Sequence, residues 1–442
     1  MSTALPQARN APQHAPLGAR LGGPLGAPSL AARLGVVWRQ FFQRVNGHKA
    51  AAPLSPDATL AALLDRRQLD LDPAASRQWV AGRAVLITGA GGTIGAELAR
   101  QIAGFGPARL GLLDHAEYAL WQTEQDLAAR HPVLARQMIV ADVRDASRLR
   151  IVCERFRPDI VFHTAALKHV PIVEENPIEG LLTNTVGTRH VADAARASGA
   201  QAMVLISTDK AVDPASVMGA SKLLAEMYCQ ALDTAARPRS EGMEMPLGRM
   251  PPGEMRCITV RFGNVLGSTG SVVPLFARQL ARGGPLTVTH PDMQRYFMTA
   301  REAIGLVLRA GALGATEAAP PGAIFVLDMG EPVRILDLAR RLIRMAGLTP
   351  GRDVAIHFTG PRPGEKLAEQ KLAGTEPTLP TLCPGLLMAT PRIVEAAIAA
   401  RAIDELEAAC RAGQERLALA LVSRLIPGFN HRPAGSADRM RD

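Results

Sequence analysis

The sequence predicts an α/β protein whose core is a doubly wound parallel sheet. Short, mostly apolar runs such as Ala84–Thr88 and Ala202–Ile206 are typical of strands buried on both faces, and helical segments separate them. A glycine-rich turn directly follows the first run, and acidic residues follow the next two. This alternation indicates a Rossmann-type sheet with a smaller C-terminal α/β part.

The strands and helices follow one another in chain order with short turns between them. The run 138–140 leads into an acidic turn, and the run 159–163 leads into a turn of small residues. A helix from about residue 179 to about residue 198 then carries the chain to the next strand. The predicted strands cover residues 84–88, 110–113, 138–140, 159–163, 202–206 and 257–261.

Three glycines mark the turn after the first strand. Gly89, Gly92 and Gly95 allow the backbone to turn tightly and to approach a pyrophosphate closely. The next helix begins near Thr93, with Ile94 in its first turn, so its N-terminus would face the phosphate oxygens. A glycine triplet alone is weak evidence, but this one lies between a strand and a helix. It therefore predicts a dinucleotide site.

Residues after the later strands complete the predicted cofactor site. Asp114 ends its strand at the distance where a carboxylate can hold the ribose hydroxyls of the adenosine, although an ordinary strand-end cap is the alternative. The same carboxylate should repel a 2′-phosphate, which favours NAD over NADP. Asp142 and Val143 are candidates for contact with the adenine, and the small side chains of Ala165 and Ala166 allow the cofactor to approach.

An acid and a base follow the strand 202–206 directly. Thr208, Asp209 and Lys210 form this group, and Met218 and Lys222 lie four residues apart on one face of the next helix. Because a thioether cannot transfer protons, acid–base chemistry here would fall to residues 208–210. The alternative is a solvated turn with incidental charges.

These segments together resemble the UDP-N-acetylglucosamine 4,6-dehydratase group of bacterial polysaccharide biosynthesis, within the extended short-chain dehydrogenase/reductases. In most of that superfamily the pair at positions 218 and 222 is Tyr and Lys, so Met218 indicates a subgroup whose larger members carry a membrane-spanning N-terminal region. The similarity extends from about residue 57 to about residue 430. The matching segments are 88–97, 114–118, 163–171, 207–210, 218–222, 261–267, 295–299, 325–332 and 362–366.

The resemblance implies a lyase reaction with NAD on a UDP-sugar, yielding a 4-keto-6-deoxy sugar for surface polysaccharide, capsule or lipopolysaccharide. Lys210 would remove the C5 proton, and protonated Asp209 would donate to the departing C6 hydroxyl. Thr208 would bind the C4 oxygen, and Lys222 would bind the nicotinamide ribose. The acceptor of the C4 hydroxyl proton stays open between Asp209 and a water relay. The alternatives are an epimerase or reductase on the same scaffold, or a non-catalytic dinucleotide-binding protein.

Five further residues are predicted to bind the substrate. Asn264 would meet the diphosphate, and the planar guanidinium groups of Arg295 and Arg362 suit phosphate oxygens, although a surface charge or a structural ion pair is as good an account of each arginine. Lys168 would reach the sugar or the cofactor, and Asn184 lies on the helix 179–198.

Two departures from the family pattern stand out in this half of the chain. Thr269 stands where relatives commonly have arginine, so one cationic contact with the substrate is missing at that position. Residues 236–256 form an insertion, and their prolines and glycines predict a mobile loop.

Composition favours a cytoplasmic enzyme over a nucleic-acid binder. The net charge is +9, but residues 1–56 carry six Arg or Lys and no acid, while the rest of the chain has 44 basic and 41 acidic residues. The five cysteines show no Cys-x-x-Cys pair and no metal-ligand spacing, which indicates a reducing compartment and no metal site. No apolar run reaches the ~18 residues of a membrane span.

The chain divides into five predicted regions. Residues 1–56 form a basic, largely disordered tail, in which apolar residues at about 30–45 have helical spacing. That helix has three open roles: peripheral contact with a membrane surface, docking to a partner subunit, or packing on the enzyme body. Relatives form dimers or hexamers, so a homo-oligomer is expected. The other regions are a connector at 57–80, the NAD-binding domain at 81–260, the substrate-binding part at 261–430 and a tail at 431–442.

Overall fold

The computed structural model describes most of the chain between residues 63 and 431. The described residues are 63–64, 68–69, 71–236, 254–316, 319–374, 376–381, 383–389 and 394–431. The predicted helix at 30–45, both terminal tails apart from His431, and most of the 236–256 insertion lie outside them.

A nine-stranded sheet runs through the molecule, and seven neighbouring strands in it are parallel. Its order is β14-β15-β11-β6-β5-β4-β1-β2-β3, so the first six strands follow the 3-2-1-4-5-6 order of a Rossmann fold. The strands β15 and β14 add antiparallel pairs at the β11 edge. The bounds are β1 Ala84–Thr88, β2 Arg109–Asp114, β3 Arg136–Val140, β4 Ile160–His163, β5 Ala202–Thr208, β6 Arg256–Phe262, β11 Ile324–Leu327, β14 Thr378–Pro380 and β15 Leu386–Ala389.

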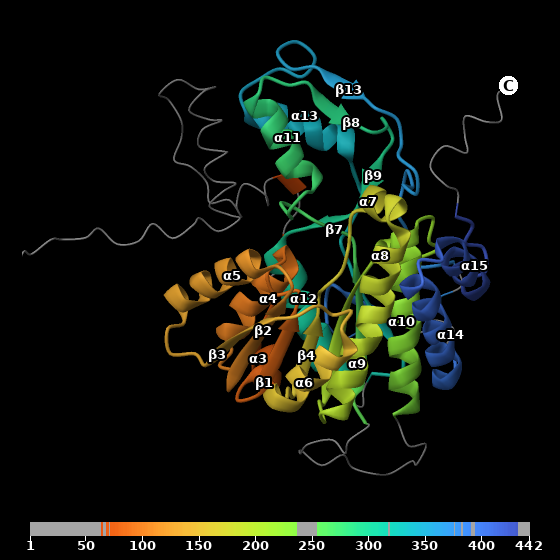
Figure 1. The fold of residues 1–442 in the computed structure, drawn as a ribbon. Coiled ribbons are helices and arrows are strands. Elements are labelled where there is room, and N and C mark those ends of the chain that lie inside the picture. The colour runs from red at the N-terminus through yellow and green to blue at the C-terminus, as the bar shows by residue number, and fades with distance from the viewer. Residues whose placement is uncertain are drawn as a thin grey trace, which may run out of the picture.

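Helices cover both faces of this sheet, as Figure 1 shows. One face packs against α3 (Ala74–Val80), α4 (Thr93–Ala103), α5 (Glu117–Arg130) and α12 (Ala300–Gly314). The other face packs against α6 (Ala146–Phe156), α8 (Pro177–Leu181), α9 (Gly187–Ala197) and α10 (Val217–Ala235), with α14 (Ala396–Arg411) and α15 (Glu415–Leu425) in the same apolar cluster. Because inner strands such as β1, β4 and β11 are buried along their whole length, their apolar runs are continuous rather than alternating.

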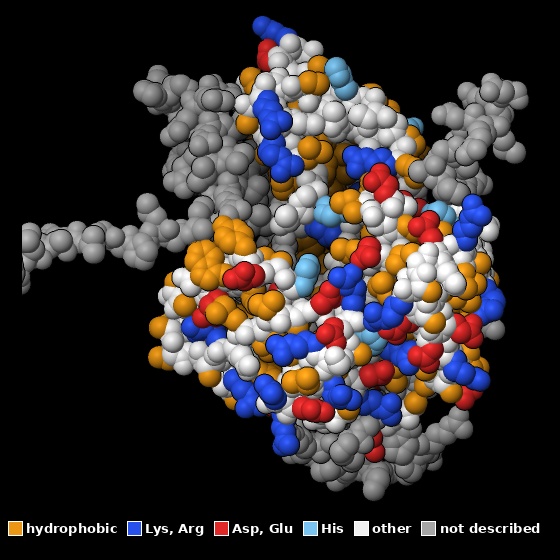
Figure 2. Space-filling model, in the orientation of Figure 1, with side chains coloured by type: hydrophobic (Ala, Val, Ile, Leu, Met, Phe, Trp, Pro, Cys, Tyr) orange, Lys and Arg blue, Asp and Glu red, His pale blue; other side chains and the backbone are white. Residues whose placement is uncertain are grey.

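A smaller lobe lies beyond the carboxyl ends of the strands, at the top of Figure 1. Its own apolar cluster joins α11 (Val272–Ala281), α13 (Ile335–Met345) and β8 (Leu286–Val288), which pairs with β13 (Ile356–Phe358). Short pairs connect the lobe to the body: β7 (Asn264–Val265) with β10 (Phe297–Met298), and β9 (Gln294–Arg295) with β12 (Val333–Arg334). Figure 2 shows the surface hollowed between the lobe and the body.

The predicted elements match the structure closely in the first half of the chain. The strand β1 has the predicted bounds, and β5 continues two residues further, through Thr208. The helix predicted at 179–198 is α8 and α9 joined by a π-helical turn at Leu182–Val186. The sheet also continues past the predicted boundary at residue 260, because β11, β14 and β15 come from the C-terminal part.

A fully buried arginine joins the two halves of the sheet. Arg261 on β6 donates bidentately to Glu226 on α10 and to Glu376 near β14. Ser207 donates to the same Glu226 from β5. Burial alone would lower the pKa of Arg261, but the two carboxylates raise it above its usual range. The guanidinium charge is therefore paired at every nitrogen.

Removing one carboxylate from this group should destabilise the fold. We expect Glu226→Ala to lower the free energy of unfolding by about 3–5 kcal/mol, because a buried cation loses its main partner. Urea denaturation measures the change. The matched control is Glu405→Ala, which breaks an exposed pair with Arg424 and should cost about 1 kcal/mol or less. Equal losses in the two variants would contradict the structural role given to Arg261 and Glu226.

Candidate functional site

The turn after β1 lies against the turn after β4, at the point where the strand order reverses. Gly89 has a positive φ of 70°, and a Cβ placed there would lie 2.6 Å from the backbone nitrogen of Ala165. A Cβ on Gly95 would clash with the carbonyl oxygen of Gly89. Thr164 donates across the gap to the carbonyl of Thr88. Only glycine fits at Gly89 and Gly95, so the glycine turn lies directly against Ala165, which the exposed Ala166 follows.

Asp114 is held at the end of β2 with its carboxylate aimed at the glycine turn. It is buried, and its Oδ2 accepts from the backbone N–H of Gly91 at 2.9 Å. Its Oδ1 accepts from the N–H of Ala116 at 2.9 Å. Each carboxylate oxygen still has acceptor capacity for a ribose hydroxyl. The structure thus places Asp114 beside the turn that would hold the pyrophosphate.

The residues predicted to meet the adenine follow β3 as expected. Asp142 is half-buried, and its carboxylate faces the guanidinium of Arg144, which also pairs with Glu179. The hydrogen bond from Arg144 lowers the pKa of Asp142, partly offset by burial. Val143 is buried against the first residue of α9, Gly187.

Asn184 lies in the π-helical turn, a feature often found at functional sites. Its Oδ1 accepts from the N–H of Leu167, and its Nδ2 donates to the carbonyl of Leu167 and to Ser221 Oγ. The side chain is completely buried. Asn184 therefore ties the turn after β4 to α10, and the structure accounts for its amide without a ligand. Its predicted contact with substrate stays a prediction.

The acid–base group occupies a 3₁₀ turn, η2 (Asp209–Ala211), directly after β5. Lys210 Nζ lies 2.9 Å from Asp209 Oδ1 and 3.2 Å from Asn264 Oδ1. Thr208 donates to the same Asp209 oxygen. Asp209 is almost fully buried, and a Cβ on Gly263 would lie 2.7 Å from its Oδ2. The structure therefore brings together Thr208, Asp209, Lys210 and Asn264.

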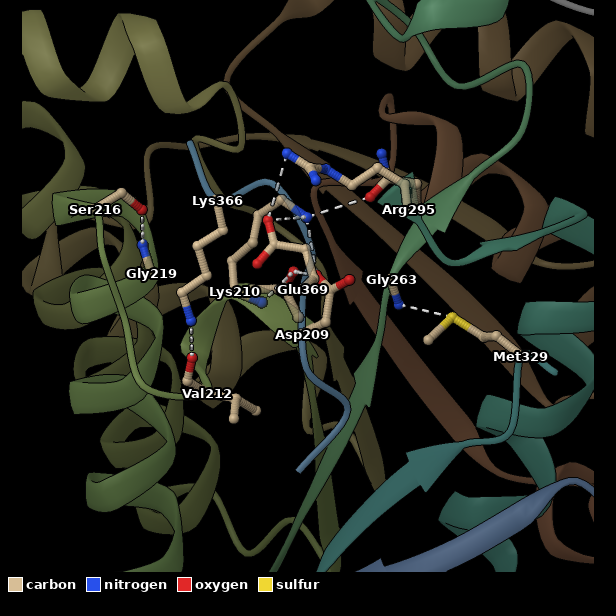
Figure 3. A network of polar contacts seen from close by, with 12 residues as sticks. Asp209, Lys210, Val212, Ser216, Gly219, Gly263, Arg295, Met329, Lys366 and Glu369 are labelled. Atoms are coloured by element: carbon tan, nitrogen blue, oxygen red, sulfur yellow. Dashed lines mark hydrogen bonds and ion pairs between the residues drawn. The ribbon is translucent and has the colours of Figure 1, made fainter. Parts of the chain in front are cut away.

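Helix α10 supports this turn and carries the methionine–lysine pair. Ser216 caps the helix by accepting from the N–H of Gly219, and a Cβ on Gly219 would clash with the carbonyl oxygen of Lys210 (Figure 3). Met218 and Lys222 are both buried. Burial lowers the pKa of Lys222 to about 8, although Glu226 acts in the opposite direction.

His163, on β4, is buried and uncharged. Burial, with a contribution from Lys222, lowers the pKa of His163 to about 3. His163 is therefore neutral at pH 7 and lies between the hydroxyls of Thr88 and Thr188.

A segment from the C-terminal part lies over the acid–base turn. We call residues 362–371 the strap. Lys366 Nζ donates to the carbonyl of Val212, and the carbonyl of Leu367 accepts from the Gln294 N–H and the Arg295 guanidinium (Figure 3). The strap also carries Glu369, which is buried between Lys210 and Arg295. Sequence analysis missed Glu369, whose only signal is its place three residues after the segment 362–366.

The remaining predicted substrate residues lie apart from this cluster or are already paired. Arg295 is buried, and its Nη1 donates to the carbonyls of Gln294 and Leu367. Arg362 is exposed on the strap. Lys168 is also exposed, yet nearby protein atoms desolvate its amine enough to lower its pKa. Thr269, at the departure from the family pattern, hydrogen-bonds Thr93 at the start of α4.

Comparison with known proteins identifies the family of this chain. The profile of the polysaccharide biosynthesis protein family matches residues 85–390. This chain belongs to that family. It is 45% identical over 317 residues to the probable polysaccharide biosynthesis protein EpsC of Bacillus subtilis, covering 71% of this chain and 49% of EpsC. The chain thus spans about half the length of that relative.

Two further proteins, one of them a solved structure, are similar to this chain. A UDP-glucose 4-epimerase of Rickettsia typhi is 34% identical over 255 residues, which are 58% of this chain and 67% of the epimerase. The solved structure of DesIV, a dTDP-glucose 4,6-dehydratase from Streptomyces venezuelae with NAD bound, aligns with a TM-score of 0.54 at 21% identity. That alignment covers 75% of this chain and 97% of DesIV, and it supports the Rossmann-type fold alone. No helix of the described residues is long and apolar enough to cross a membrane.

The contact between Gly219 and the acid–base turn leads to a direct test. We expect Gly219→Ala to reduce the turnover of a nucleotide sugar strongly, because the added methyl group displaces the Lys210 backbone. The affinity for a dinucleotide should stay nearly unchanged, because the glycine turn at residues 89–95 is left intact. Isothermal titration with NAD and a turnover assay measure the two effects. Gly374→Ala is the control, since a Cβ there meets nothing within 4 Å. A parallel loss of cofactor binding would contradict the local role of Gly219.

Proposed function

We propose that this protein is an NAD-dependent 4,6-dehydratase that converts UDP-N-acetylglucosamine to UDP-4-keto-6-deoxy-N-acetylhexosamine for surface polysaccharide synthesis. The observation that carries this proposal is the Asp209–Lys210 pair at the carboxyl end of β5. The two side chains are 2.9 Å apart, and Met218 stands where the superfamily usually has tyrosine. An acid and a base in contact suit elimination, in which one proton is removed and another is donated.

The residues around the glycine turn fit a dinucleotide. Gly89, Gly92 and Gly95 leave space for a pyrophosphate at the N-terminus of α4, and Asp114 has acceptor capacity for the ribose hydroxyls. We favour NAD over NADP, because a 2′-phosphate would meet the buried Asp114 carboxylate. When bound, NAD would supply the hydride acceptor for C4 and the hydride donor for C6. Lys222, buried below this position, would hold the nicotinamide ribose.

The acid–base turn would carry out the proton transfers. Thr208 would hydrogen-bond the C4 oxygen, Lys210 would take the C5 proton, and Asp209 would protonate the C6 hydroxyl as it departs. The C4 ketone makes the C5 proton acidic, and the adjacent pair works on neighbouring sugar atoms. Asn264, which accepts from Lys210, would orient the lysine and contact the diphosphate.

The exposed cations among the predicted substrate residues are the candidates for binding the UDP group. Arg362 and Lys168 are exposed and carry charge suited to phosphate oxygens. Arg295 is buried with its Nη1 bound to backbone carbonyls, so we propose that it acts mainly by holding the strap. A substrate carrying a nucleoside diphosphate fits this set better than an uncharged sugar does.

A UDP-sugar 4-epimerase is the second candidate, supported by the likeness to the Rickettsia typhi enzyme. An epimerase oxidises and reduces C4 alone, so it needs one acid–base group there and has no use for a base at C5. This chain has the opposite set of groups. Met218 stands in place of the tyrosine that usually acts at C4, and the Asp209–Lys210 pair is present.

Substitution of the pair tests the dehydratase proposal. We expect Lys210→Met and Asp209→Asn each to slow the loss of water by ~10²–10⁴-fold, because each removes the dominant base or acid. Mass spectrometry of UDP-N-acetylglucosamine incubated without added reductant measures water loss, and titration with NAD should show retained binding. Asp213→Asn, on the exposed part of the same loop, is the control expected to keep turnover. Near wild-type turnover in Lys210→Met or Asp209→Asn would contradict the role assigned to that residue.

The basic N-terminal region motivates a proposal about location and assembly. We propose a cytoplasmic homo-oligomer whose residues 30–45 contact the inner membrane face peripherally. Basic residues near an anionic surface contribute on the order of 1 kcal/mol each, and residues 1–56 carry six with no acid. Apolar side chains at 30–45 would add to that affinity.

Deleting residues 1–50 should weaken binding to anionic vesicles and leave turnover in solution intact. Flotation of full-length and shortened protein with vesicles, at low and at high salt, measures the binding. Vesicles of neutral lipid are the control, since the electrostatic part of the attraction is absent from them. Full-length protein that stays in solution at low salt with anionic vesicles would leave docking to protein as the role of this segment.

A further inference from the structure

Glu369 brings a second carboxylate to Lys210 from a distant part of the chain. Its Oε1 lies 3.7 Å from Lys210 Nζ and 3.8 Å from Arg295 Nη2. Figure 3 shows the carboxylate between these two cations, with Asp209 on the same lysine. The strap contacts at Lys366 and Leu367 fix it in this place.

Both carboxylates beside Lys210 keep one oxygen unpaired. Asp209 Oδ1 accepts from Thr208 and Lys210, whereas its Oδ2 is buried with no hydrogen-bond partner among the described residues. Glu369 Oε2 is buried and unpartnered in the same way. A buried oxygen without a partner costs about 1–3 kcal/mol, so native exceptions call for an explanation. Two such oxygens around one lysine are suited to receive protons.

The proposed elimination needs one more proton site than the Asp209–Lys210 pair offers. The 2.9 Å ion pair holds one proton, on the ammonium group of Lys210. Oxidation at C4 passes a hydride to the bound nicotinamide and releases the hydroxyl proton. If Asp209 takes that proton, it becomes the acid required at C6. Lys210 is then still an ammonium ion, with no lone pair for the C5 proton.

We propose that Glu369 takes the proton that Lys210 must lose before it can act as the base at C5. This proposal rests on the dehydratase function proposed above. The C4 proton goes to Asp209, and the ammonium proton goes to Glu369. Neutral Lys210 then removes the C5 proton while Asp209 protonates the leaving C6 hydroxyl, which departs as water. After the hydride returns to C6, Lys210 returns its proton to C5 and recovers its own from Glu369.

The geometry suits a transfer that is completed when substrate binds. The 3.7 Å separation is longer than a hydrogen bond, and contacts of this kind are often long in a site without substrate and shorten in the complex. The charged groups that face Glu369 are Lys210 from η2 and Arg295 from β9, with Asp209 beyond the lysine. Met218 on α10 has no group that could take the proton instead.

Measuring C4 oxidation and water loss separately distinguishes a proton-accepting role of Glu369 from a purely structural one. Glu369→Gln removes the acceptor and keeps the shape, and Glu369→Ala leaves room for a small carboxylate. Glu331→Gln, an exposed glutamate in the loop before β12, is the matched control. Each variant, loaded with NAD, is mixed with UDP-N-acetylglucosamine. The absorbance of reduced nicotinamide follows C4 oxidation, and mass spectrometry follows water loss, with and without formate and across a range of pH.

We expect Glu369→Gln to oxidise C4 at nearly the wild-type rate and to lose water ~10²–10⁴-fold more slowly, so that reduced nicotinamide accumulates. Water loss by Glu369→Gln should become faster as the pH rises, because in this variant a base from the solvent must remove the proton from the Lys210 ammonium group. Formate should restore part of the rate of Glu369→Ala and none of that of Glu369→Gln. Equal slowing of both steps, unchanged water loss in Glu369→Gln, or no effect of formate on Glu369→Ala would overturn the proposal. Wild-type protein that releases no water would instead overturn the dehydratase function itself.

Discussion

The site depends on the close approach of two backbone turns at the edge of a parallel sheet. All parallel strands present their carboxyl ends at the same edge, and the strand order reverses between β1 and β4, the position where Rossmann-type sheets generally bind ligands. The turns after these two strands touch through Gly89 and Ala165, with no side chain between them. Asp114 and Asn184 then tie their neighbours to the same two turns through backbone hydrogen bonds. A side chain at Gly89 or Gly95 would therefore displace the backbone of these turns.

Two buried charge groups lie near each other in this molecule, and they differ in one respect. The group around Arg261 is fully paired, because Glu226 and Glu376 together accept from all of its guanidinium nitrogens. The group around Lys210 has two carboxylates, and each keeps a buried oxygen without a partner among the described residues. A satisfied network fixes the packing of β5, β6 and α10. An incompletely satisfied one costs stability, and such a cost is expected where groups must gain and lose protons.

How far the sequence predicts this structure depends on how local each feature is. The strand β1, the glycine turn and the Asp209–Lys210 pair are encoded within a few neighbouring residues, so apolar runs and spacing were enough to find them. Asn184 was selected, but its contacts depend on a π-helical turn that no spacing rule predicts. Arg295 was selected for its charge, whereas one of its two backbone partners, Leu367, lies in the strap 72 residues further on. Glu369 meets Lys210 only through the tertiary fold, and its place three residues after the segment 362–366 does not reveal that contact.

The methionine at position 218 determines how many proton sites the proposed reaction needs. In the proposed reaction, a tyrosine there would offer a proton acceptor for the C4 hydroxyl, and the Asp209–Lys210 pair would then need to manage only the elimination. With a thioether in its place, the C4 proton would add to a pair that already holds one, and the proposed reaction would need a third group. The structure has a carboxylate in contact range of the lysine, carried by the C-terminal strap rather than by the sheet. In the proposed reaction, the strap therefore contributes to the chemistry itself, because the proton sites are complete only when it lies over the turn.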